Sequence, residues 1–122
     1  MDVALWIAAA VLAFASAGAG VMKLTQPKEK LQETQGWVED FSQPALRMIG
    51  GLETLGAIGL IVPALLDIAP VLVPMAAVGL ALLQTGALIT HVRRREPQFV
   101  VNIVLIALAV FVAWGRFGDY AF

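Results

Sequence analysis

The chain has 122 residues, a net charge of −1 and no cysteine. Hydrophobic residues make up 60% of it and charged residues 14%, against about 45–50% and about 25% in typical soluble domains. A soluble domain this small could not hide so much apolar surface from water, so the composition predicts an integral membrane protein. Without cysteine there are no disulfides, thiol redox relays or iron–sulfur ligands, and the near-neutral charge gives no reason to expect nucleic acid as a partner.

Four stretches approach the length of about 20 apolar residues that a helix needs to cross a bilayer. They cover residues 3–22, 46–66, 68–90 and 98–114. The first has no basic residue before it and is longer than the apolar part of a signal peptide, which favours a membrane span over a cleaved leader. Pro63, Pro70 and Pro74 lie near the turn between the second and third spans, and Pro74 is placed to kink the third helix near its start. We predict an all-α fold, an antiparallel four-helix transmembrane bundle that forms one membrane domain over residues 1–122.

The longest connection, residues 24–45, differs in composition from the spans. Pro27 is placed to begin a helix, and the residues that follow alternate in charge, as on a solvated face. An apolar side is supplied by Leu31, Trp37, Val38 and Phe41. We predict a short amphipathic helix over about 27–42 that lies in the headgroup layer with Trp37 at the interface, and the alternative is a polar loop.

The basic residues are divided unevenly between the two sides of the predicted bundle. The first and third connections carry seven of the eight, Lys23, Lys28, Lys30, Arg47, Arg93, Arg94 and Arg95. Only Arg116 falls on the other side, so the positive-inside rule places both connections in the cytoplasm and both termini outside it. We expect a multi-pass protein of a bacterial inner membrane, with Trp6 and Trp114 as anchors at the outer interface.

Glu53 is the acidic residue that lies inside a predicted span. It lies about seven residues into the second span, or about 10 Å deep at about 1.5 Å per residue. Gly50 and Gly56 lie three residues to either side and allow a neighbouring helix to approach closely. An unpaired carboxylate is costly at this depth. Glu53 therefore either pairs with Arg47 or Lys23 and fixes the packing, or faces a cavity, where it could act as a catalytic acid or base.

The other spans place polar side chains at a similar depth in the cytoplasmic half. The resulting candidate ligand site or polar cluster comprises Lys23, Arg47, Glu53, Gln84, His91 and Asn102. Residues such as Gln84 and Asn102 are more often hydrogen-bond partners between helices than ligands, and His91, beside three arginines, is better explained as an interface residue. In the outer half, Asp67, Arg116 and Asp119 are expected to be interface residues. With a lone histidine and no cysteine, we expect no metal site.

Short motifs give the chain a family resemblance. The first span ends in Gly18-Ala19-Gly20-Val21-Met22-Lys23-Leu24, and the second opens with Arg47-Met48-Ile49-Gly50-Gly51-Leu52-Glu53-Thr54-Leu55-Gly56. With the third span ending in His91 and basic residues, the chain resembles the DoxX-like family of small four-span bacterial membrane proteins. The recurrent glutamate of that family corresponds to Glu53, and its preceding arginine to Arg47.

The resemblance implies a link to redox chemistry in membranes, because the wider group includes a small subunit of a thiosulfate:quinone oxidoreductase and members linked to oxidative-stress defence. Its thiol chemistry does not carry over to a chain without cysteine. The leading hypothesis is an accessory membrane subunit of a quinone- or oxidative-stress-linked redox system, with a site among its helices for a quinone or another lipophilic molecule. Its possible protein partners are a redox partner subunit and a second copy of the chain. The alternatives are a membrane enzyme that uses Glu53 as acid or base on a lipophilic substrate, and a small proton-coupled transporter. The small multidrug-resistance transporters carry their essential glutamate in the first helix, whereas the first span here has no acidic residue.

Overall fold

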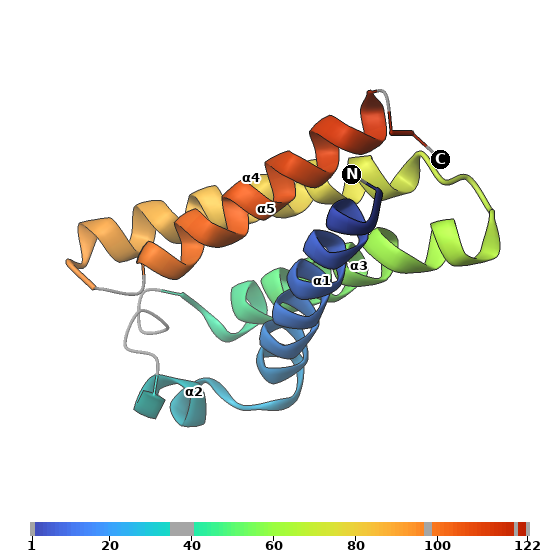
Figure 1. The fold of residues 1–122 in the computed structure, drawn as a ribbon. Coiled ribbons are helices and arrows are strands. Elements are labelled where there is room, and N and C mark those ends of the chain that lie inside the picture. The colour runs from blue at the N-terminus through green and yellow to red at the C-terminus, as the bar shows by residue number, and fades with distance from the viewer. Residues whose placement is uncertain (1, 35–40, 97–98, 119, 122) are drawn as a thin grey trace.

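The protein is described by a computed structural model that covers residues 2–34, 41–96, 99–118 and 120–121. Within these residues the helices are α1 (Asp2–Thr25), α2 (Lys28–Thr34), α3 (Gln43–Leu66), α4 (Leu72–Arg93) and α5 (Phe99–Phe117) (Figure 1). α1, α3, α4 and α5 are long and apolar enough to cross a membrane. The predicted all-α bundle with four spanning helices is therefore confirmed.

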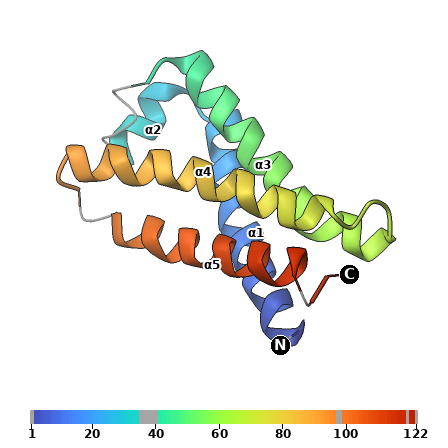
Figure 2. The same cartoon turned by 90° about the horizontal axis from the view of Figure 1, so that it is seen from above.

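The long helices form two closely packed pairs. α1 packs along α3, and α4 packs along α5, while α3 and α4 join the pairs. α1 also meets α5, where the first turn of α1 approaches the last turn of α5. Figure 2 shows α4 and α5 side by side, α1 crossing them, and α3 and α4 diverging from the turn that links them. The axes of α3 and α4 are therefore farther apart at the end of the bundle that carries α2 than at the turn that links them.

Small residues build much of the core. It draws on all four long helices, with Ala8, Ala9, Leu12 and Ala13 from α1, Ala57 and Leu60 from α3, Val73, Ala77 and Leu80 from α4, and Ala109 and Val112 from α5. Large apolar side chains such as Phe14 and Leu82 lie exposed on the outside of the bundle. Such a surface suits contact with lipid, because exposing it to water would carry a large free-energy cost.

Two glycines allow α1 and α3 to approach each other closely. A Cβ atom added to Gly20 would lie 2.5 Å from Thr54 Oγ1 and 2.7 Å from the Gly50 carbonyl oxygen. A Cβ atom on Gly50 would lie 2.8 Å from both the Gly20 carbonyl oxygen and Lys23 Cβ. The helices cross at this point because neither backbone carries a side chain there, a common device in membrane bundles.

The turn between α3 and α4 shortens the predicted third span at its start. Asp67 and Ala69 adopt left-handed backbone conformations with φ of 52° and 45°, and α4 begins at Leu72 rather than at Ile68. Pro70 precedes the helix. Pro74 falls in the first turn of α4, where a missing N–H group removes no internal hydrogen bond of the helix.

The connection between α1 and α3 contains the expected short helix, α2, which the structure describes over Lys28–Thr34. In α2 the backbone N–H of Lys28 donates to Gln43 Oε1 at 2.7 Å, and Leu31 is buried against Leu46. The predicted helix extends to residue 42, but Ser42 instead caps α3, where its Oγ accepts a hydrogen bond from the Ala45 N–H. Trp37 and Val38 lie outside the described residues.

Candidate functional site

Glu53 and Lys23 form an ion pair inside the bundle. The Lys23 ammonium donates to Glu53 Oε1 at 2.7 Å, and the two side chains are only 9% and 5% exposed. The pair sits next to the glycine crossing of α1 and α3, one turn from Gly20 and from Gly50. Of the two cations considered as partners for Glu53, the structure therefore places Lys23 against it, and Arg47 lies half-buried near the start of α3.

Gln84 and Asn102 form a second buried polar contact, between α4 and α5. Asn102 Nδ2 donates to Gln84 Oε1 at 2.7 Å. Both residues are buried, so the contact replaces hydrogen bonds that neither amide could make to lipid. This geometry fits the expectation of an interhelical hydrogen bond.

One buried polar residue from each long helix lies at the same end of the core. We refer to Ser16, Glu53, Gln84 and Asn102 as the polar layer. Three of these residues lie one helical turn from a core residue of the same helix: Ser16 from Leu12, Glu53 from Ala57 and Gln84 from Leu80. The fourth, Asn102, is hydrogen-bonded to Gln84. The sequence analysis did not include Ser16 among the candidate site residues, because a lone serine in an alanine-rich span gives no distinctive signal.

His91 belongs to a separate polar group at the end of α4. Its Nδ1 lies 2.8 Å from Glu96 Oε1, and Arg94 Nε donates to Glu96 Oε2 at 3.2 Å. Burial opposes the charge of Glu96, but these hydrogen bonds and the positive charge of Arg94 outweigh it and lower the pKa of the carboxyl group. His91 is buried and helps to close the end of α4 against the following turn.

The end of the bundle where α1 begins and α5 ends contains a buried charge. Arg116, predicted to be a membrane-interface residue, lies in the last turn of α5 and is only 5% exposed. Its guanidinium donates to Asp2 Oδ1 at 2.6 Å and to the Tyr120 carbonyl oxygen at 2.9 Å, and lies 5.7 Å from the ring centre of Trp6. Arg116 is buried because α1 and α5 meet over it. Trp114 is exposed on the outer surface.

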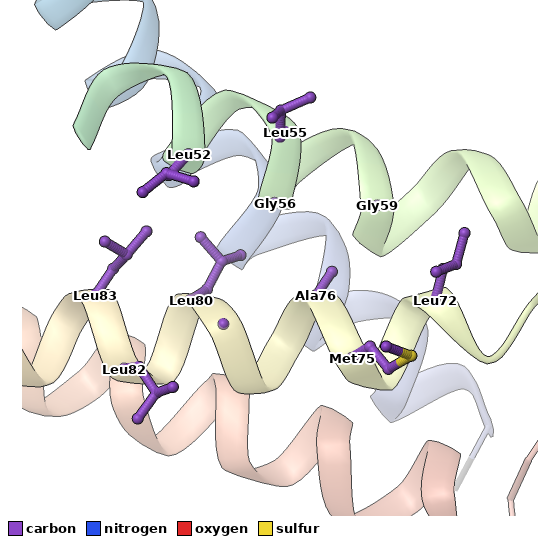
Figure 3. Close-up of a pocket in the computed structure, with 11 residues that line it drawn as sticks. Leu52, Leu55, Gly56, Gly59, Leu72, Met75, Ala76, Leu80, Leu82 and Leu83 are labelled. Carbon is purple, nitrogen blue, oxygen red and sulfur yellow. The ribbon is translucent and has the colours of Figure 1, made fainter. Parts of the chain in front are cut away.

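An apolar groove of about 660 Å³ runs along the outside of the bundle between α3 and α4 (Figure 3). Its walls are Leu52, Leu55, Gly56 and Gly59 on α3, and Leu72, Met75, Ala76, Gly79, Leu80, Leu82 and Leu83 on α4. Leu52 and Leu83 directly precede Glu53 and Gln84 in the sequence, and the two polar residues themselves are buried and do not line the groove. None of the groove-lining residues was singled out from the sequence, because apolar residues are the rule in membrane helices.

The groove offers apolar contact along its length. The Glu53 carboxylate is engaged by Lys23, and Asn102 by Gln84. In the residues that the structure describes, no group of three His, Cys, Asp or Glu side chains is placed to hold a metal ion.

Comparisons with known proteins identify a family for this chain but no individual relative. Searches of curated proteins and of solved structures gave no significant match. The family model described as the DoxX-like family matches residues 7–112, a segment that runs from the second turn of α1 almost to the end of α5. This chain is therefore a membrane protein of the DoxX-like family.

Proposed function

We propose that this protein is an accessory membrane subunit of a quinone- or oxidative-stress-linked redox system, and that it holds a lipophilic molecule between α3 and α4. The observation that carries the proposal is the apolar groove between α3 and α4. Its volume, about 660 Å³, lies within the range of about 300–1,000 Å³ that is typical of small-molecule sites.

The shape of the groove favours an occupant that enters from the bilayer. Its walls are leucine, methionine, alanine and glycine, and it opens along the side of the bundle. An apolar tail can lie along such a groove without leaving the hydrocarbon. A quinone has such a tail, and the redox connection within the family supports a ligand of this kind.

A catalytic role for Glu53 is less well supported than binding. An acid or base must exchange a proton with its substrate. Lys23 Nζ lies 2.7 Å from the Glu53 carboxylate, so this carboxylate already has a partner inside the bundle. A transporter would likewise need Glu53 to gain and lose its proton during each cycle. We therefore favour the accessory, ligand-holding role over both alternatives.

Two glycines of α4 provide a matched test of the groove. Gly79 lines it and Gly86 does not, and a Cβ atom on either would meet nothing within 4 Å. Gly79→Leu should fill the groove without a clash, while Gly86→Leu adds the same side chain two turns away. We expect wild type and Gly86→Leu to bind decylubiquinone, measured as a shift in melting temperature in detergent.

Gly79→Leu should weaken that binding at least about tenfold, which corresponds to roughly two methylene groups displaced from apolar contact at about 0.8 kcal/mol each. Both variants replace a helical glycine by a better helix former, so differences in helix propensity cancel between them. Equal affinity of the two variants for decylubiquinone, or no binding by wild type, would contradict the proposal.

A further inference from the structure

The three consecutive arginines at the end of α4 differ in their surroundings. The middle one, Arg94, is half-buried, and its Nε donates to Glu96 Oε2 at 3.2 Å. Arg93 and Arg95 are exposed, and their side chains make no hydrogen bond or ion pair to any of the residues that the structure describes. Two guanidinium groups are therefore available to a partner outside the chain.

The backbone closes the end of α4 without help from these two side chains. Basic side chains near a helix C-terminus often bond the last carbonyl groups of the helix. Here the N–H groups of residues 94–96 donate to the carbonyl oxygens of residues 90–92, at 2.9–3.1 Å. Arg95 also has a φ of 57°, in the left-handed region where glycine is usual. Helix capping therefore accounts for neither guanidinium group, and glycine would suit the backbone better at position 95.

The two arginines lie where the lipid-facing surface of the bundle ends. Val92 directly precedes them, α5 continues the chain with Val100 and Val101, and all three valines are exposed. Apolar side chains exposed in this way belong in hydrocarbon, because water would penalise them. The segment between them therefore lies at the level of the phospholipid headgroups, at the end of the bundle that carries α2 (Figure 1).

The charge of this segment favours one kind of headgroup. Residues 93–96 carry three arginines and one glutamate, a net charge of +2. By contrast α2, at the same end of the bundle, carries two lysines and two glutamates and is neutral overall. Each basic residue near a membrane surface raises the affinity for anionic lipid about fivefold. A zwitterionic lipid contains its own cation and gains less from the same arginines.

We propose that Arg93 and Arg95 bind the headgroup of an anionic phospholipid, such as phosphatidylglycerol, in the leaflet at the end of the bundle that carries α2. Guanidinium groups donate hydrogen bonds to phosphate oxygens as well as neutralising their charge. The acyl chains of this lipid lie along the exposed apolar sides of α4 and α5. The site is separate from the groove between α3 and α4 and does not depend on what occupies that groove.

Two lipids that differ only in the headgroup test the proposal. 1-Palmitoyl-2-oleoyl-phosphatidylglycerol and the corresponding phosphatidylcholine are to be titrated into the whole protein in dodecyl maltoside, an uncharged detergent, and the bound lipid measured by native mass spectrometry. We expect wild type to bind phosphatidylglycerol about five- to thirtyfold more tightly, the range for one or two arginines at about fivefold each. The preference should shrink as sodium chloride is added, because salt screens exposed charges.

Arg95→Gly is the informative variant, because it removes a guanidinium group and relieves the left-handed backbone. It should lower the affinity for phosphatidylglycerol about fivefold, while the melting temperature without lipid rises. Arg93→Gln combined with Arg95→Gly should bring the preference for phosphatidylglycerol close to one. Lys28→Gln combined with Lys30→Gln removes the same number of positive charges from α2 and should keep at least half of the preference.

Three results would overturn the proposal. Equal binding of the two lipids by wild type would leave the exposed arginines to another partner, such as an acidic protein surface. A full preference for phosphatidylglycerol in the Arg93→Gln, Arg95→Gly variant would show that the lipid binds elsewhere. An equal loss of preference in the α2 variant would show that the charge of this whole end of the bundle, rather than these two arginines, attracts the lipid.

Discussion

Lys23 and Glu53 place two opposite charges in the interior of the bundle. Each charge alone would have a large desolvation cost in this environment, and their contact at 2.7 Å offsets much of it. The pair also joins the end of α1 to the first half of α3, so it fixes how far the two helices overlap.

Removing one member of the pair should therefore destabilise the protein strongly. Glu53→Gln keeps the side-chain volume but removes the carboxylate that Lys23 Nζ contacts at 2.7 Å. We expect a loss of about 3–5 kcal/mol in the free energy of unfolding, with the helical fold retained. Unfolding by sodium dodecyl sulfate, followed by circular dichroism, measures this loss.

The double variant Lys23→Met, Glu53→Leu is the control. It removes both charges together and replaces them with apolar side chains of similar size, so it should recover most of the stability lost in Glu53→Gln. If the double variant were as unstable as the single one, side-chain packing rather than uncompensated charge would be the cause.

At the scale of the helices, the crossing of α1 and α3 depends on glycine. A methyl group on Gly20 would press on the Thr54 hydroxyl and on the backbone of Gly50, and the backbone cannot turn aside as a flexible side chain can. Gly18, two residues earlier on α1, faces open space instead. One helix thus contains both a constrained and an unconstrained glycine.

Alanine substitutions at these two positions should have opposite effects. Gly18→Ala should raise stability by up to about 1 kcal/mol, because alanine favours the helix more than glycine does. Gly20→Ala gains the same propensity but forces the helices apart, and should lower stability by about 1–3 kcal/mol, the usual cost of overpacking. Melting temperatures in one detergent compare the two variants, and a Gly20→Ala protein as stable as Gly18→Ala would refute the close crossing.

At the scale of the whole molecule, the two ends of the bundle differ. At one end, Arg116 donates a hydrogen bond to Asp2 Oδ1, so the last turn of α5 meets the first turn of α1. α2 and the arginines that follow α4 lie at the other end. The four spanning helices thus bring both chain ends to the same side of the membrane.

The uneven distribution of basic residues predicts that both chain ends lie on the side of the membrane opposite the cytoplasm. Alkaline phosphatase fused to the C-terminus should be active, and a fluorescent protein that folds only in the cytoplasm should stay dark there. Neutral residues in place of Arg93, Arg94 and Arg95 should weaken this preference, because they form the densest basic cluster. A neutral residue in place of Arg116, which lies at the opposite end of the bundle, serves as the control for the loss of a basic residue. A cytoplasmic C-terminus in the unmodified protein would invalidate the predicted orientation.

The sequence by itself determined the fold class, because four long apolar stretches in a bilayer can satisfy their backbone hydrogen bonds only as helices. It also singled out Glu53, Gln84 and Asn102, since polar residues stand out in apolar spans. Helix ends were less well determined. The start of α4 at Leu72 follows from the left-handed conformations of Asp67 and Ala69, which are not evident from apolar composition.

Only the tertiary structure decided which polar residues pair and where a ligand could lie. Sequence spacing gives the face of a residue on its own helix, whereas contacts between helices depend on how the helices cross. The glycine crossing brought Lys23, rather than Arg47, to Glu53, and the meeting of α1 and α5 buried Arg116. The groove likewise depends on how the side chains of α3 and α4 lie against one another, and apolar residues that face lipid or a ligand look the same in the sequence.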